Sequence, residues 1–236
     1  MKRKNIVPKT TGYHYRNVNI WPRPIQQPTP PVWMTGMSVD TGTMAAERGH
    51  VVGTLLSGGT AKPMYDAYRK RARELGWEAG PDRFAYAAII GVGHSTDEGL
   101  RRADIIADYV RTAPVVAEPF TNPPGYNSIA ANTMILKGGP RANRFVTDRH
   151  GEPINHRTAS VQQFMDTETV FAGTPDEVFE QIKTFNSRMG GVGHLLFFGQ
   201  GGLLTHQDAM ENIRLFGKEV APRLLELNAP ARAAAE

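Results

Sequence analysis

Short apolar runs alternate with longer amphipathic segments along most of the chain. The apolar runs cover residues 32–34, 50–56, 84–92 and 194–198, and turn-forming residues bound each of them. After each run, apolar residues recur every three or four positions, and these helical patterns cover residues 39–48, 61–75, 96–110 and 209–227. Mostly apolar strands that alternate with helices are typical of a parallel sheet covered by helices. The pattern therefore predicts an α/β fold of about four βα units.

One more helix is predicted just before the last strand. Thr174 can act as its N-cap, Pro175 fits the first helical position, and Glu177 can return a hydrogen bond to the cap. Val178, Ile182 and Phe185 then follow at helical spacing and form its apolar face.

Three segments lack this periodicity. Residues 1–31 are rich in proline and are predicted to be an extended lead-in to a main body over residues 32–227. An irregular stretch at about 114–165 is longer than ordinary connections, and we interpret it as a lid-like insertion, with partial disorder as the alternative. Residues 228–236 are Ala-rich and are predicted to fray.

Composition narrows the class of protein. The 236 residues contain no cysteine, which excludes disulfides, thiolate metal sites and a cysteine nucleophile. Lys and Arg number 27 against 23 acidic residues, and this mild balance favours a solvated surface over nucleic-acid binding. No run approaches the roughly 18 apolar residues of a membrane helix. We therefore expect a soluble, cytoplasmic protein that binds neither a membrane nor nucleic acid.

The stretch WMTGMSVDTGTMAAERG, residues 33–49, places small and hydroxyl residues where a strand becomes a helix. With Ser38 as N-cap, the third helical residue is Thr41, a neutral side chain at a position where carboxylates are common. Gly36 lets the backbone approach a ligand, and a helix amino end attracts anions. The stretch suits a phosphate. The residues alone favour the simpler alternative, in which Ser38 only caps the helix and Asp40 balances its dipole.

Seven motifs in a fixed order together resemble the luciferase-like flavin-dependent monooxygenases, a family of (β/α)8 barrels. The likeness covers about residues 13–227, and its motifs are WPRPIQQPTPPVW followed by S-x-[DE]-T and AAERG, then LLSGGTAK, FAGTPDEVFEQI, GVGHLLFFGQGGLLTH and LFGKEVAPRL. The resemblance implies a partial (β/α)8 TIM-type barrel, since only about four of eight units are evident. The implied portion is the C-terminal half of the family barrel.

The resemblance also implies a cofactor site. Ser38 and Thr41 would bind the phosphate of FMN, or of the deazaflavin F420, assisted by the Met37 and Ser38 amides and by the open approach at Gly36. Leu56 and Ser57 would lie near the ring system. The family often has S-P-E-T where this chain has Val39 and Asp40 between Ser38 and Thr41. No histidine matches the family's catalytic context, so no catalytic residue is assigned, and no metal site is expected.

The expected reaction uses reduced flavin and oxygen to oxidise a small organic substrate. Four strands of an unclosed barrel would leave open edges and an uncovered face, which favours self-association. The expected partners are therefore a second copy of the chain or a complementing N-terminal half, together with a flavin reductase. Two alternatives remain open at this point: a non-catalytic flavin-binding or scaffold protein, and a truncated fragment that is inactive alone.

Overall fold

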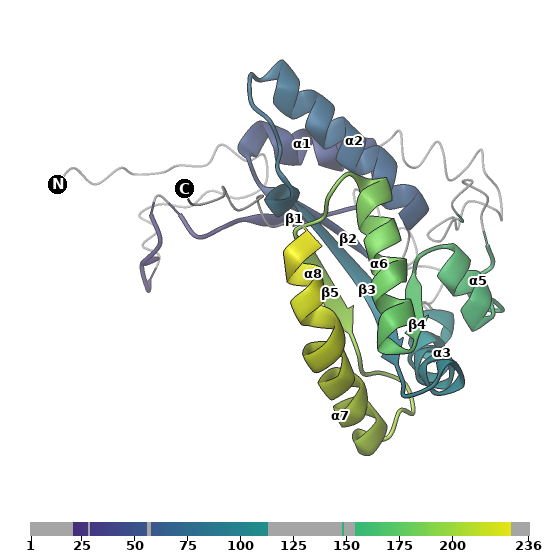
Figure 1. Ribbon diagram of the computed structural model, residues 1–236. Helices are drawn as coiled ribbons and strands as arrows, with labels where there is room; N and C mark the ends of the chain where they lie inside the picture. The colour runs from purple at the N-terminus through teal and green to yellow at the C-terminus, as the bar shows by residue number, and fades with distance from the viewer. Residues whose placement is uncertain (1–20, 28, 56–57, 113–147, 149–153, 228–236) are drawn as a thin grey trace, which may run out of the picture. The chain divides into compact units, whose positions relative to one another are not determined.

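The computed structural model describes residues 21–27, 29–55, 58–112, 148 and 154–227 (Figure 1). The chain divides into two compact units, Met1–Val32 and Trp33–Glu236, and every helix and strand below belongs to the second. Leu56 and Ser57 lie outside the described residues, as do most of the irregular stretch 114–165 and the tail 228–236.

Strands and helices alternate along the second unit. In chain order the elements are β1 (Trp33–Thr35), α1 (Val39–Arg48), β2 (Val51–Leu55), α2 (Gly58–Glu74), the 3-10 turn η1 (Pro81–Arg83), β3 (Phe84–Val92), α3 (Thr96–Thr112), α5 (Val161–Asp166), β4 (Val170–Gly173), α6 (Pro175–Met189), β5 (His194–Phe198), α7 (His206–Leu215), the π-helical segment η4 (Phe216–Val220) and α8 (Ala221–Leu227).

All strand pairs are parallel, and β3 is the centre of the sheet. β2 pairs with residues 84–87 of β3, β4 pairs with residues 89–92, and β5 pairs with residues 85–89. Because Ile89 is paired with both β4 and β5, these two strands lie on opposite edges of β3. β2 and β4 therefore share one edge of β3, end to end, and β1 extends the sheet beyond β2.

Two hydrophobic cores lie on opposite faces of β3. Tyr86 and Ile90 belong to the larger core, which α1, α2, α6 and the last helical segments complete. Ile89 belongs to a smaller core with α3 and α5. Figure 1 accordingly shows α3 and α6 on opposite sides of β4. β3 is buried along its whole length, which explains its unbroken apolar sequence.

The order in which the chain forms the strands explains why α3 lies on the face of the sheet that carries the smaller core. The chain advances across the sheet from β1 through β2 to β3, then steps back to β4 before it crosses to β5. Parallel crossovers share one hand, so a backward step places its helix on the opposite face.

The predicted α/β fold with alternating βα units is confirmed, and it is consistent with a partial TIM-type barrel. The capping box of α6 is also present, with Thr174 and Glu177 hydrogen-bonded reciprocally. Two elements are absent from the sequence prediction. The strand β4 has four residues, and α5 has six and lies largely within the stretch predicted to be irregular. Both are too short to produce a detectable period.

The last helical pattern differs from its prediction. The helix begins at His206 rather than near residue 209, and the π-helical segment η4 interrupts it. Ile213 belongs to the predicted apolar stripe but is 47% exposed, whereas Asn212 is completely buried. The side chain of Asn212 has backbone partners in the sheet, described below, and this outweighs the preference for an apolar residue.

Candidate functional site

The turn between β1 and α1 is anchored to the sheet. The Gly36 amide donates to the carbonyl of Gly53 in β2 at 3.1 Å, which continues the pairing of the two strands past the end of β1. Ser38 then adopts an extended backbone (φ −111°, ψ 156°) and serves as the N-cap of α1. The carboxyl end of β1 and the amino end of α1 are thus held together.

Ser38 and Thr41, predicted together from the sequence, are brought together by this turn. The Ser38 Oγ accepts a hydrogen bond from the Thr41 backbone amide at 3.2 Å, and the two hydroxyl oxygens lie 3.0 Å apart. The capping role expected of Ser38 is confirmed. Ser38 is exposed and Thr41 is half-buried, so solvent reaches the hydroxyl pair.

Gly36 leaves room for Thr41. A Cβ at position 36 would come within 2.5 Å of both Oγ1 and Cγ2 of Thr41. Gly42, one residue further along α1, is equally constrained, because a side chain there would overlap the backbone carbonyl of Met64 in α2. The two glycines therefore set the turn and the close packing of α1 on α2.

The amino end of α1 differs from those of three other long helices. In α3, α6 and α7 the third helical residue is a carboxylate, respectively Glu98, Glu177 and Asp208. The Glu177 carboxylate accepts from the Thr174 amide at 2.8 Å, and this backbone hydrogen bond lowers its pKa. In α1 the corresponding residue is the neutral Thr41, and the acid of the first turn is the exposed Asp40. The hydroxyl pair of α1 can therefore donate to an external anion.

Of the remaining residues predicted to bind the cofactor, the structure describes Met37 but not Leu56 or Ser57. Met37 directly precedes the N-cap and is 40% exposed. Leu56 and Ser57 lie outside the described residues. Their neighbour Leu55 ends β2 and is 43% exposed.

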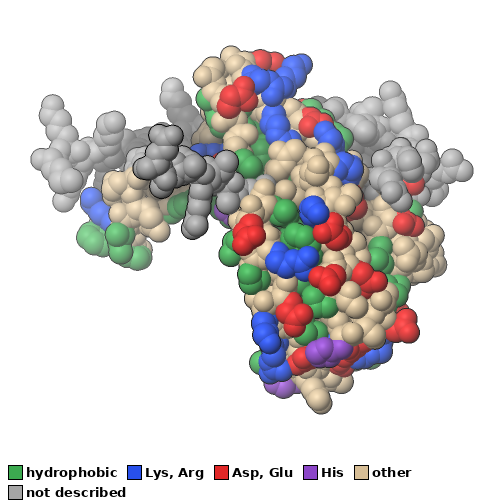
Figure 2. Space-filling model, viewed as in Figure 1, with side chains coloured by type: hydrophobic (Ala, Val, Ile, Leu, Met, Phe, Trp, Pro, Cys, Tyr) green, Lys and Arg blue, Asp and Glu red, His purple; other side chains and the backbone are tan. Residues whose placement is uncertain are grey.

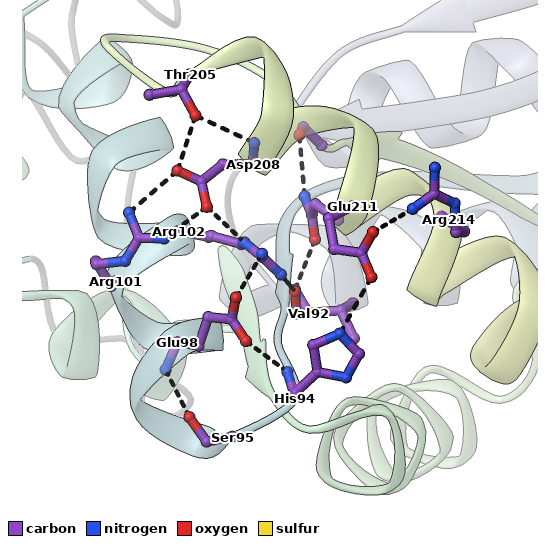
Figure 3. Close-up of polar contacts among 12 residues, drawn as sticks. Val92, His94, Ser95, Glu98, Arg101, Arg102, Thr205, Asp208, Glu211 and Arg214 are labelled. Atoms are coloured by element: carbon purple, nitrogen blue, oxygen red, sulfur yellow. Dashed lines mark hydrogen bonds and ion pairs between the residues drawn. The ribbon is translucent and has the colours of Figure 1, made fainter.

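A polar network that sequence reasoning missed lies at the carboxyl end of β3 (Figure 3). Arg102 of α3, only 3% exposed, donates to the Val92 carbonyl at 2.6 Å, to Glu98 at 2.5 Å and to Asp208 at 3.2 Å. Asp208 also accepts from Arg101 at 2.6 Å, and this bond is the main cause that lowers the pKa of Asp208 to about 2. The network joins α3 to α7 across the end of the central strand.

Asn212 of α7 continues the sheet's hydrogen bonding beside this network. Its Oδ1 accepts from the Val92 amide at 2.6 Å, and its Nδ2 donates to the carbonyls of Ile90 and Gly199, each at 2.9 Å. β3 and β5 stop pairing at Phe198, so the side chain of Asn212 replaces the missing backbone partners. The only signal in the sequence is a polar residue next to an apolar stripe.

The surface of the described residues carries charges of both signs. Figure 2 shows basic and acidic side chains interspersed over one face. Ion pairs among the described residues include Arg223–Asp176 (2.7 Å) and Lys183–Glu180 (3.0 Å). Within the described part of the chain, no group of His, Asp and Glu has metal-site geometry. No described helix is both long enough and apolar enough to cross a bilayer.

A comparison with models of protein families identifies the family of this chain. The family model described as luciferase-like monooxygenase matches residues 4–191. The chain belongs to the luciferase-like monooxygenase family. No curated protein matches the chain.

Several solved structures have a fold similar to that of this chain. Monooxygenase RslO1 from Streptomyces bottropensis aligns with a TM-score of 0.65 at 16% identity, over 94% of this chain and 56% of that one. The oxygenating constituent of 3,6-diketocamphane monooxygenase from Pseudomonas putida, in complex with FMN, aligns at 0.57 and 18%, over 83% and 49%. An F420-dependent secondary alcohol dehydrogenase with an F420-acetone adduct aligns at 0.56 and 15%, over 93% and 56%.

The TM-scores of these alignments show a shared fold. The luciferase-like chain spans about half the length of the structures it matches.

Proposed function

We propose that this luciferase-like chain takes part in a flavin-dependent monooxygenase reaction, in which reduced FMN and oxygen oxidise a small organic substrate. F420 is the alternative cofactor. Family membership supports the enzyme class, and similar folds occur in an FMN complex and in an F420-dependent enzyme. The observation that carries the proposal is the hydroxyl pair Ser38–Thr41 at a helix amino end whose third residue is neutral.

The donor set fits a phosphate. Each hydroxyl can both accept and donate, so Ser38 can keep its bond from the Thr41 amide while its own O–H donates to a phosphate oxygen. The Thr41 hydroxyl can donate to a second oxygen, and the Met37 and Ser38 amides assist. Hydrogen bonds to a charged partner are stronger than neutral ones. The side chain missing at Gly36 leaves room for the Thr41 side chain, which keeps its hydroxyl beside that of Ser38.

Other parts of the chain would handle the ring and the substrate. We place the ring system near Leu56 and Ser57, after the exposed end of β2. When bound, the flavin supplies the redox chemistry, and the chain orients it. We propose that the stretch 114–165, apart from its last residues that pack in the smaller core, acts as a lid that excludes water from the reacting centre.

We also propose that the chain works with partner proteins. A flavin reductase would supply reduced cofactor in the cytoplasm. The strands at the two ends of the sheet expose large apolar side chains, with Trp33 of β1 at 44%, Leu196 of β5 at 43% and Phe198 of β5 at 41%. Exposed apolar surface next to a strand edge favours association. A second copy or a complementing half-barrel would cover it.

Flavin titration followed by a turnover assay tests the proposed function. The chain is titrated with FMN and F420, then supplied with the reduced cofactor, oxygen and a panel of small ketones, aldehydes and alkanes. We expect flavin binding and oxygen-dependent product. Binding without product supports the non-catalytic alternative, and absence of binding to either cofactor contradicts the proposal.

A further inference from the structure

The strand β5 forms an edge of the sheet. Among the described residues it pairs with β3 and with no other strand, so one side of its backbone has no strand partner there. β3 and β4 are buried along their whole length, whereas every residue of β5 is at least partly exposed. Leu196 and Phe198, which point to the same face of the strand, are its two most exposed residues.

The sequence around β5 lacks the residues that usually protect such an edge. Charged residues make up 21% of the chain, but residues 189–207 contain no Lys, Arg, Asp, Glu or Pro. Charged side chains, prolines and short strand length keep edge strands from pairing with other chains. The edge strand β1 has such protection, because it is three residues long and follows directly after Pro30, Pro31 and Val32. β5 is therefore the edge that is open to a further strand.

An apolar groove lies beside β5, at the amino ends of the strands. Its volume is about 960 Å³, and sixteen residues line it. They come from the amino ends of β1 and β5 with the residues just before β5, and from η1, α6, η4 and α8, which Figure 1 shows next to β5. Phe197 and Phe198 extend this surface along the strand. It approaches the roughly 20–30 residues that each side of a stable interface uses.

We propose that β5 pairs with β5 of a second copy of the chain, antiparallel and across a two-fold axis at Leu196. In this register Leu196 lies opposite Leu196 of the second copy, and His194 lies opposite Phe198. Leu195 lies opposite Phe197 on the other face. All these cross-strand pairs are apolar or aromatic, and no like charges oppose each other. A two-fold interface needs only one self-complementary surface, and β5 supplies it.

The antiparallel arrangement also accounts for the groove. It brings the carboxyl end of one β5 beside the amino end of the other, where the groove lies. Phe198 of the second copy then lies next to His194, whose ring already contacts Trp33 at 4.8 Å. Three aromatic rings would thus meet at each end of the paired strands, and such pairs stabilise interfaces beyond their buried area. The second copy is a partner named in the proposed function, on which this inference rests for its partner, but the pairing of β5 needs no flavin.

Analytical ultracentrifugation of the full chain tests whether the dimer forms through β5. At about 50 µM, where a dimer with a micromolar dissociation constant is populated, the wild type should sediment as a dimer. Leu196→Lys places two like charges opposite each other, so the dissociation constant should rise about tenfold or more. The control is Leu75→Lys, an exposed position outside the groove, which should behave as the wild type. A monomeric wild type overturns the proposal, and so does an unchanged dissociation constant in Leu196→Lys.

Disulfide cross-linking tests the register. The chain has no cysteine, so a disulfide from a single introduced Cys joins two copies. Opposite residues of antiparallel strands have Cα atoms about 4.5–5.5 Å apart, which suits a disulfide, so Leu196→Cys should cross-link on mild oxidation. His194→Cys should not, because the two residues would lie about 13 Å apart along the strands. His194→Cys combined with Phe198→Cys should cross-link again.

Leu75→Cys gives the background rate of cross-linking by collision. Leu196→Cys that cross-links no faster than Leu75→Cys overturns the pairing, even if Leu196→Lys does not fold. Efficient cross-linking of His194→Cys alone overturns the register. Flavin titration of the same proteins separates the two proposals. A monomer that binds flavin contradicts only the pairing of β5, and a β5-linked dimer that binds no flavin contradicts only the proposed function.

Discussion

The rings of Trp33 and His194 lie 4.8 Å apart, at the amino ends of β1 and β5, although β2 and β3 separate these strands in the sheet. Three strand spacings of a flat sheet amount to about 14 Å. Contact across this interval requires the sheet to curl towards one face, as it does in a barrel. The Nε2 of His194 lies 3.0 Å from the Asp82 carbonyl, which fixes the ring near the turn before β3.

This contact should contribute to the stability of the curled sheet. A double-mutant cycle of Trp33→Ala and His194→Ala should give a coupling energy of about 0.5–1.5 kcal/mol, as other aromatic pairs do. Urea unfolding of the four proteins measures it. Strictly additive effects would show that the rings touch without stabilising the curvature.

Asn212 should be among the most sensitive residues of the fold. Asn212→Ala removes three hydrogen bonds and leaves the buried Val92 amide without a partner, so we expect a loss of about 3 kcal/mol in unfolding free energy. The matched control is Asn155→Ala, which removes a hydrogen bond from an exposed loop and should cost less than about 1 kcal/mol. Equal losses in the two variants would contradict the stabilising role of the three Asn212 hydrogen bonds.

The Asp208 network should make stability depend on pH in the acid range. The pKa of Asp208 is about 2 in the folded chain, below its ordinary 3.8, so the unfolded chain binds the proton first. Its contribution is complete above about pH 4 and is lost as pH falls towards 2. Solvent screening reduces it to about 1 kcal/mol. Wild type should lose that much more than Asp208→Asn between pH 5 and pH 2, and parallel losses would count against the network.

Gly36 should matter for phosphate binding more than for stability. Gly36→Ala forces the Thr41 side chain away from its position beside Ser38, so FMN affinity should fall about tenfold, which is roughly 1.4 kcal/mol. Riboflavin affinity should change little. Gly217→Ala is the control, because a Cβ there meets nothing within 4 Å. A Gly36→Ala protein that binds FMN normally would show that the position of the Thr41 hydroxyl does not matter for the phosphate.

Periodicity predicts the long elements well and the short ones poorly. Residues 84–92 and 194–198 match β3 and β5, and the caps at Ser38 and Thr174 are where the sequence places them. β4 and α5 are held by tertiary contacts around β3, and these contacts leave no local pattern. The backward step across the sheet from β3 to β4 could not be predicted for the same reason.

The polar residues singled out in the structure likewise include some that local sequence predicts and others that only the folded chain brings together. The pairing of Ser38 with Thr41 follows from local helix geometry, so three residues of spacing are enough to predict it. Arg102 and Asn212 are polar residues on amphipathic helices, and their backbone partners become apparent only in the folded chain.

The dissociation constant of FMN for Ser38→Ala with Thr41→Ala tests the central claim most directly. Losing two hydrogen bonds to a charged group should cost on the order of 3 kcal/mol, or roughly 100-fold in affinity, with riboflavin binding preserved. Thr205→Ala, which removes the N-cap of α7, controls for the loss of a cap alone. An FMN affinity equal to that of the wild type would remove the amino end of α1 from the cofactor site.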